Sequence, residues 1–74
     1  MAIVKTFHYE PALRDTKHTE VQAIVRTGES DGEKFIQIDT YGSPDRQIAG
    51  KQSQSIRLTE DAYNFLKLVG DKHF

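Results

Sequence analysis

The residues with the clearest chemical potential lie in the second half of the chain, where a polar loop leads into an alternating segment. Gly42 and Gly50 bracket the loop with seven residues between them, and Gln52 follows Lys51. A Walker phosphate loop needs four residues between its glycines and a Ser or Thr after the lysine, so that motif is excluded. Two interpretations remain, a looser anion site or a solvated loop whose glycines allow tight turns. The anion site would combine cations with hydroxyls: Arg46, Lys51 and Arg57 with Ser43, Ser53 and Ser55.

Residue patterns for catalysis or metal binding are weak in this chain. A metal-dependent nuclease needs at least two acids that converge on a cation, and the acids nearest the loop are Asp39 and Asp45. No serine has a neighbouring histidine that would act as its base. The three histidines are far apart, and the absence of cysteine rules out a thiolate site. We therefore predict a protein that is not an enzyme and uses no metal and no cofactor.

A second group of polar residues alternates along the predicted strands. Nucleobases stack on aromatic rings, at about 1–3 kcal/mol per base, and arginines contact phosphates. Cross-strand packing or self-association is the other common use of aromatic rings such as Phe35 and Tyr41. The acidic residue Asp39 on the same face counts against a nucleic-acid surface. One sheet face is expected to carry Gln22, Ile24, Arg26, Phe35, Gln37, Asp39, Tyr41, Ser53, Ser55 and Arg57.

Four predicted strands and a C-terminal helix position these side chains. β-branched and aromatic residues, or strict alternation, predict strands over residues 3–9, 20–27, 33–41 and 53–58. Thr59 is expected to cap the helix, whose first turn is acidic, and Gly70 is expected to end it. The helix would cover one face of the sheet with an apolar stripe formed by Ala62, Phe65, Leu66 and Val69.

The hairpin between the second and third strands has two possible registers. A turn centred on Ser30-Asp31 places Val25 opposite Ile36 and Arg26 opposite Phe35. A turn centred on Asp31-Gly32, which type I′ chemistry prefers, places Val25 opposite Ile38. Either register keeps one apolar set together on the buried face, because side chains alternate with a period of two. That set is Val21, Ala23, Val25, Ile36 and Ile38.

Length and composition limit the remaining possibilities. The 74 residues form a single predicted domain, 1–74, and a chain this short buries only about 60% of its unfolded surface. Without disulfides or a metal, oligomerisation is the expected source of further stability, most simply as a homodimer. No segment approaches the roughly 20 apolar residues that cross a bilayer, and there is no signal-peptide pattern. We expect a cytoplasmic protein with no membrane partner.

Two segments resemble the positive-cofactor-4-like family of transcriptional coactivators and its small bacterial relatives. The run from Gly50 to Ala62, followed by Leu66, is similar to that family's basic approach, last strand, cap and helix. Residues 34–39 resemble the preceding strand, which ends in an Ile-Asp pair. The resemblance covers roughly residues 20–69. It implies a curved antiparallel sheet with one helix, usually dimeric, that binds single-stranded DNA in transcription regulation. The binding surface it implies consists of Arg26, Phe35, Gln37, Tyr41, Arg46, Lys51 and Arg57.

The sequence therefore predicts an α+β fold in which an antiparallel sheet of three or four strands precedes one amphipathic helix. The expected function is non-catalytic binding of single-stranded nucleic acid, DNA above all, through the open sheet face and the loop 42–52. The alternative is a small protein–protein interaction module, a regulator or inhibitor of phage or mobile-element type, that binds no nucleic acid. Binding to phosphates weakens steeply with salt, and this separates the two hypotheses. The expected binding residues are Arg26, Phe35, Gln37, Tyr41, Arg46, Lys51, Ser53, Ser55 and Arg57.

Overall fold

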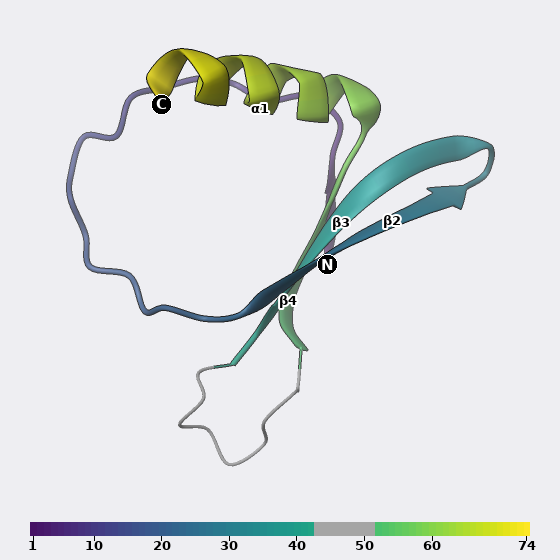
Figure 1. Cartoon of the computed structure of the whole chain (residues 1–74), viewed down its shortest axis with the longest axis horizontal. Helices are drawn as coiled ribbons and strands as arrows, with labels where there is room; N and C mark the ends of the chain where they lie inside the picture. The colour runs from purple at the N-terminus through teal and green to yellow at the C-terminus, as the bar shows by residue number, and fades with distance from the viewer. Residues whose placement is uncertain (43–51) are drawn as a thin grey trace.

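The computed structural model describes residues 1–42 and 52–74. In this part of the chain, β1 (Ala2–Val4), β2 (Ala23–Ser30), β3 (Glu33–Tyr41) and β4 (Gln52–Leu58) form one sheet in the order β1-β4-β3-β2. Helix α1 (Glu60–His73) follows β4 directly, and a long segment joins β1 to β2 in a wide arc (Figure 1). The predicted α+β architecture with a C-terminal helix is confirmed.

The sheet is mixed, so the prediction of a purely antiparallel sheet is wrong. β1 pairs in parallel with β4, and Ile3 lies beside Arg57. The predicted strand over residues 3–9 is also wrong beyond Val4. The Thr59 backbone N–H donates to the Val4 carbonyl and the Thr59 hydroxyl to the Lys5 carbonyl, both at 3.2 Å. These bonds direct the chain along α1 instead of along the sheet.

The β2–β3 hairpin has the register that type I′ turn chemistry predicts. Asp31 and Gly32 have positive φ angles of 53° and 79°, and together they form the whole connection. This turn allows pairing from Ser30 and Glu33 onward and places Val25 opposite Ile38. The predicted strands 20–27 and 33–41 left residues 28–32 for the turn, which is longer than the two-residue turn observed. Arg26 faces Gln37 in this register, so the pairing with Phe35 is wrong.

Helix α1 begins as predicted and ends later than predicted. The Thr59 hydroxyl accepts a hydrogen bond from the Ala62 backbone N–H at 3.3 Å, which is the expected N-cap. The helix continues past Gly70, and Phe74 is the C-cap. A salt bridge of 2.9 Å between Lys67 and Asp71 supports this last turn. In the described residues no helix is long and apolar enough to cross a membrane.

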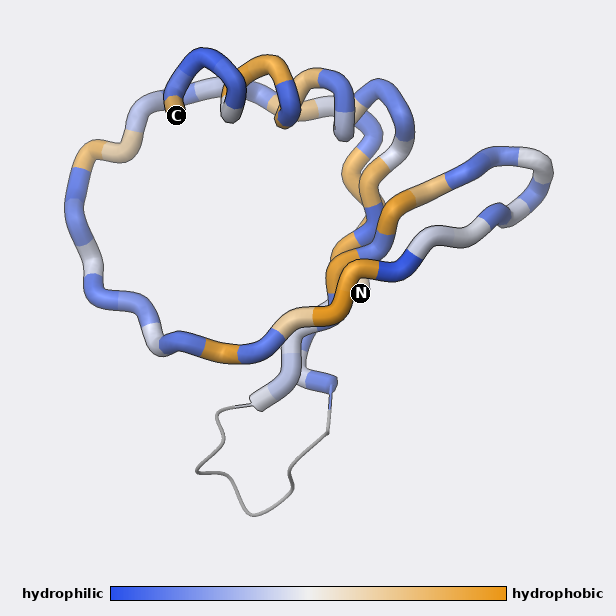
Figure 2. The backbone as a smooth tube through the Cα atoms, viewed as in Figure 1, coloured by the Kyte–Doolittle hydropathy of each residue, from blue (hydrophilic) through white to orange (hydrophobic). Residues whose placement is uncertain are grey.

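The core of a single chain is small. Within residues 1–42 and 52–74, the buried apolar side chains are Leu58 and Ala62, where α1 leaves the sheet. α1 contacts β3 and β4, so Val25 on β2 keeps 66% of its surface exposed. The expectation that the β2 apolar residues are buried is wrong for one chain, because the helix does not reach that strand. Figure 2 shows the hydrophobic backbone segments gathered where the strands cross.

Candidate nucleic-acid interface

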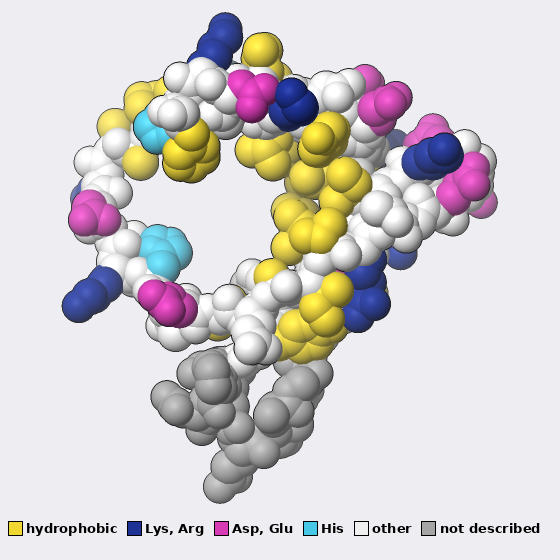
Figure 3. Space-filling model, viewed as in Figure 1, with side chains coloured by type: hydrophobic (Ala, Val, Ile, Leu, Met, Phe, Trp, Pro, Cys, Tyr) yellow, Lys and Arg dark blue, Asp and Glu magenta, His cyan; other side chains and the backbone are white. Residues whose placement is uncertain are grey.

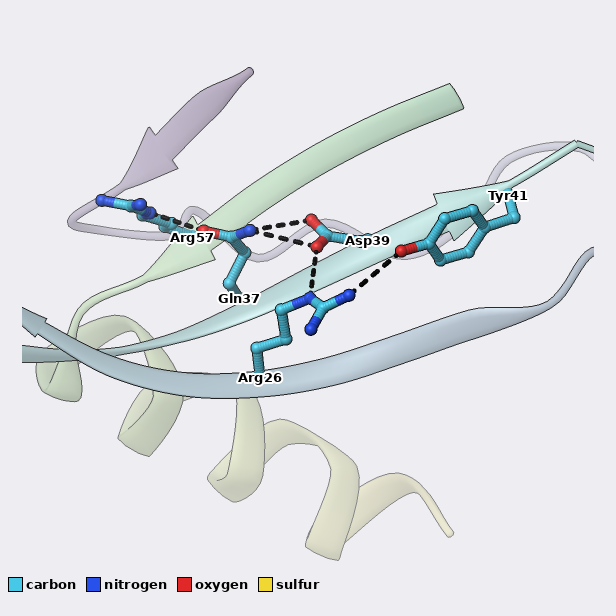
Figure 4. Close-up of polar contacts among 5 residues, drawn as sticks. All are labelled: Arg26, Gln37, Asp39, Tyr41 and Arg57. Atoms are coloured by element: carbon cyan, nitrogen blue, oxygen red, sulfur yellow. Dashed lines mark hydrogen bonds and ion pairs between the residues drawn. The ribbon is translucent and has the colours of Figure 1, made fainter. Parts of the chain in front are cut away.

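The sheet face opposite α1 carries a cluster of polar and aromatic side chains, which we call the polar face: Arg26, Phe35, Gln37, Asp39, Tyr41, Ser55 and Arg57. Strand pairing brings them together, because Gln37 lies between Arg26 on β2 and Arg57 on β4. Asp39 likewise pairs with Ser55. Side chains of alternate residues point to the same face of a strand, and those drawn in Figure 4 project away from the helix.

Asp39 is the centre of the polar face. Its side chain is only 3% exposed. The Arg26 Nε donates to its Oδ2 at 2.9 Å and the Gln37 Nε2 to its Oδ1 at 2.9 Å. A hydrogen bond from Ser55, together with those from Arg26 and Gln37, holds the pKa of the Asp39 carboxyl below its usual value, although burial acts in the opposite direction. Asp39 is therefore a compensated carboxylate, which means that hydrogen-bond donors and the Arg26 charge offset its negative charge. In return it orients these neighbouring side chains.

The contacts continue in both directions from Asp39 to form a row across three strands (Figure 4). The Arg26 Nη2 donates to the Tyr41 hydroxyl at 3.2 Å. On the other side, the Arg57 Nε donates to the Gln37 Oε1 at 2.7 Å. Hydrogen bonds to Tyr41 and Asp39 raise the pKa of the Arg26 guanidinium. The row holds both arginines in defined positions while Arg26 remains about half exposed, at 53%.

Phe35 on β3 ends the row beyond Arg57. The Arg57 Cζ lies 4.0 Å from the centre of the Phe35 ring, which is a cation–π arrangement. Gly28 is the β2 partner of Phe35, and a Cβ atom at this glycine would lie 2.6 Å from the Phe35 Cζ. The ring thus occupies the space that a Gly28 side chain would need, and the glycine permits its position.

Two apolar residues border the polar face. Ile3 on β1 pairs with Arg57, and Ile24 on β2 pairs with Asp39, so both lie on this side of the sheet. Their side chains are exposed, at 53% and 43%. The face therefore combines a positively charged row with apolar margins. Such a surface suits a ligand that has both anionic and flat apolar parts.

The structure brings together six of the nine residues predicted to bind nucleic acid: Arg26, Phe35, Gln37, Tyr41, Ser55 and Arg57. Ser53 lies apart from them, because the pairing of β3 with β4 is irregular between Thr40 and Tyr41. The Ser53 hydroxyl is 3.4 Å from the Thr40 hydroxyl. Thr40 follows Asp39 on β3 and so lies on the side of the sheet that bears α1. Arg46 and Lys51 lie outside the described residues, as does most of the loop 42–52.

Sequence reasoning missed features of two residues of the polar face. Asp39 was expected to count against a nucleic-acid surface, and its ion pair with Arg26 was not foreseen. The signal was present in the alternation, since Arg26 and Asp39 share a face and lie diagonally across β2 and β3. Gly28 was assigned to the turn, whereas it lies beneath the Phe35 ring. That position depends on the register of the β2–β3 hairpin, and the alternation of side chains along the strands allowed two registers.

The described residues show no group of three or more His, Asp or Glu side chains that would hold a metal ion. Comparison with known proteins found no matching family model, no matching curated protein and no matching solved structure. The function is therefore argued from the geometry of the polar face.

Proposed function

We propose that this chain is a non-catalytic protein that binds single-stranded nucleic acid, DNA above all, on the polar face. The observation that carries the proposal is the compensated Asp39. The carboxylate is buried and engaged by Arg26, Gln37 and Ser55, so it no longer opposes a phosphate. The guanidinium groups of Arg26 and Arg57 lie on the same sheet face as this carboxylate, as do the Tyr41 and Phe35 rings.

The chemistry of the row suits a single strand. A guanidinium carries five N–H donors in a planar fork, and Arg26 uses Nε and Nη2 in its bonds to Asp39 and Tyr41. Phosphates would bind at the outer edges of Arg26 and Arg57. Bases would stack on Tyr41 and on Phe35, where a base takes the place of the Arg57 guanidinium. Stacking requires unpaired bases, so a duplex would bind less tightly.

Fluorescence anisotropy of a labelled oligonucleotide tests this proposal. We expect micromolar or tighter binding to a single strand, weaker binding to the duplex, and a loss of affinity as salt rises. The slope of log affinity against log salt is about −0.7 for each phosphate contact on a single strand. Equal affinity for both forms, or no binding at low salt, would contradict the proposal.

Matched substitutions separate stacking from charge. Phe35→Leu keeps an apolar side chain over Gly28 and removes the ring, so we expect affinity to fall about five- to a hundredfold for every sequence. Tyr41→Phe keeps its ring and should bind nearly as the original chain does, whereas Tyr41→Leu should not. Arg57→Gln should reduce the salt slope by about 0.7, while Lys72→Gln on α1 should leave it unchanged.

The alternative function, a protein–protein interaction module, is favoured by one observation. Ile3 and Ile24 expose apolar surface at the margins of the polar face, and apolar patches with polar surroundings are typical of protein interfaces. Binding through such a patch would change little with salt and would be lost in Ile24→Asp. The nucleic-acid proposal includes a cytoplasmic location, the compartment in which the sequence leads us to expect the protein.

A further inference from the structure

The surface of one chain is far larger than that of a compact protein of its size. The accessible area is 6911 Å² for a mass of 8.4 kDa, whereas a compact monomer of this mass exposes about 4,600 Å². The radius of gyration is 14.4 Å, compared with about 11 Å for a compact chain of this length. Each chain thus has an excess of about 2,300 Å², measured against the compact monomer.

Part of the exposed surface is apolar and lies on α1 and beside its start. Phe65 and Leu66 of the apolar stripe are 36% and 46% exposed. A hollow of about 550 Å³ opens between the hairpin and the start of α1, and Ile36, Leu58 and Tyr63 are among its lining residues. Beyond its first turns the helix projects past the sheet (Figure 1). Part of its predicted apolar stripe therefore has no counterpart in the same chain.

The connection between β1 and β2, residues 5–22, behaves as an arm. It is attached at both ends, by the Lys5 carbonyl to Thr59 and by the Gln22 carbonyl to the Tyr41 backbone N–H at 2.9 Å. Near its start Phe7 stacks on Phe65, with ring centres 6.3 Å apart. The space-filling view shows an opening bordered by the arm, α1 and the sheet, with hydrophobic side chains along it (Figure 3). The arm carries Leu13, which is 93% exposed.

We propose that a second copy of this chain fills that opening, so that two chains form an intertwined homodimer. The apolar stripes of the two α1 helices face each other, and each arm passes around the helix of the partner. Connections of this length without secondary structure are uncommon in compact domains, where they are usually functional loops or linkers. The inference is independent of nucleic-acid binding, since the polar face lies on the opposite side of the sheet.

A second copy fits the observations better than an unrelated protein. Burying the whole excess on both chains would remove about 4,600 Å² in total, an upper limit that lies in the range of obligate homodimers. Two-fold symmetry lets the apolar stripe of each chain cover the stripe of the other. The net charge of −1 gives the two copies little reason to repel. Leu58 and Ala62 alone form too small a core for a stable isolated chain.

The mass of the full chain in solution is the first test, by light scattering after size exclusion across a range of concentrations. We expect a species of twice 8.4 kDa whose thermal unfolding midpoint rises with protein concentration. A folded monomer with a midpoint independent of concentration would overturn the proposal, and so would an open series of larger assemblies.

Substitutions locate the interface. Leu66→Asp should abolish the dimer, whereas Asn64→Asp adds the same charge on the opposite side of α1 and should leave it intact. Leu13→Ser should raise the dimer dissociation constant about tenfold, by removing a buried apolar contact of the arm. Its control is Lys17→Ser in the same arm, which should change the constant less than twofold. Dimers that persist in Leu66→Asp, or equal effects in the two arm variants, would refute this interface.

Cross-linking provides a separate test that does not depend on the folding of Leu66→Asp. The chain contains no cysteine, so a single introduced thiol reports one position. Leu66→Cys should form a disulfide between two chains under mild oxidation, and Asn64→Cys should form little. Equal cross-linking of the two variants would contradict the helix-to-helix contact.

Discussion

The two faces of the sheet differ in how far one chain completes them. On the polar face every contact in the row from Tyr41 to Phe35 is made within the chain, and among the described residues no buried side-chain nitrogen or oxygen lacks a hydrogen bond. On the helix side Leu66 and Val25 remain 46% and 66% exposed. Hydrogen bonds have a short range and a defined geometry, whereas burying apolar surface needs area on both sides. One short chain therefore satisfies the first requirement more easily than the second.

The largest expected effect comes from removing the small apolar core. Leu58 is 4% exposed, and Leu58→Ala should lower the free energy of unfolding by about 2–5 kcal/mol. Ile24→Ala, on the margin of the polar face, should lower it by less than about 1.5 kcal/mol because the side chain is partly exposed. Chemical denaturation measures both values. Similar losses in the two variants would remove the contrast between the faces.

The next effect concerns the glycine beneath Phe35. In Gly28→Ala the new Cβ would lie 2.6 Å from the ring, so Phe35 must move away from Gly28 and change its position relative to Arg57. We expect a loss of about 1–3 kcal/mol in the free energy of unfolding, typical of overpacking. The NMR resonance of the Arg57 Nε–H should shift as the ring moves relative to the guanidinium. If stability and that resonance both stay unchanged, the proposed support of Phe35 by Gly28 is wrong.

A pH dependence would follow from Asp39. Its pKa is lowered in the folded chain from an ordinary value of 3.8. The ionised carboxyl therefore stabilises the fold above that value, and the contribution disappears as pH falls through the lower folded pKa. Asp39→Asn should lower the unfolding midpoint at neutral pH. The difference between the two proteins should shrink as the pH falls below 3.8, and a difference that stays constant with pH would contradict the ionised network.

The smallest effect is a gain in stability in the last turns of α1. Gly70 lies inside the helix, and no described atom outside its local backbone lies within 4 Å of the position of an added Cβ. Gly70→Ala should therefore stabilise the chain by about 0.5–1 kcal/mol, because glycine is a poor helix former. Thermal unfolding would detect this gain, and destabilisation would show that the position is covered in the dimer.

Much of the local structure was predictable because it depends on neighbouring residues. Alternation located β3 within its observed bounds, and Thr59 followed by acidic residues predicted the start of α1. The length of β1 was not predictable. Residues 5–9 have strand-forming types, but the bond from Thr59 to the Lys5 carbonyl and the stacking of Phe7 on Phe65 remove them from the sheet. These contacts join residues more than fifty positions apart.

The sequence alone determined which residues share a face and where the helix begins, because the two-residue period of a strand and the N-cap are local rules. The turn chemistry of Asp31-Gly32 favoured the observed register over its alternative. Only the tertiary structure decided that β1 is parallel, that Arg26 neutralises Asp39, and that Phe35 lies over Gly28. It also showed that α1 leaves much of its apolar stripe uncovered. These features depend on how separate elements meet in space, and the pattern along one element does not encode that meeting.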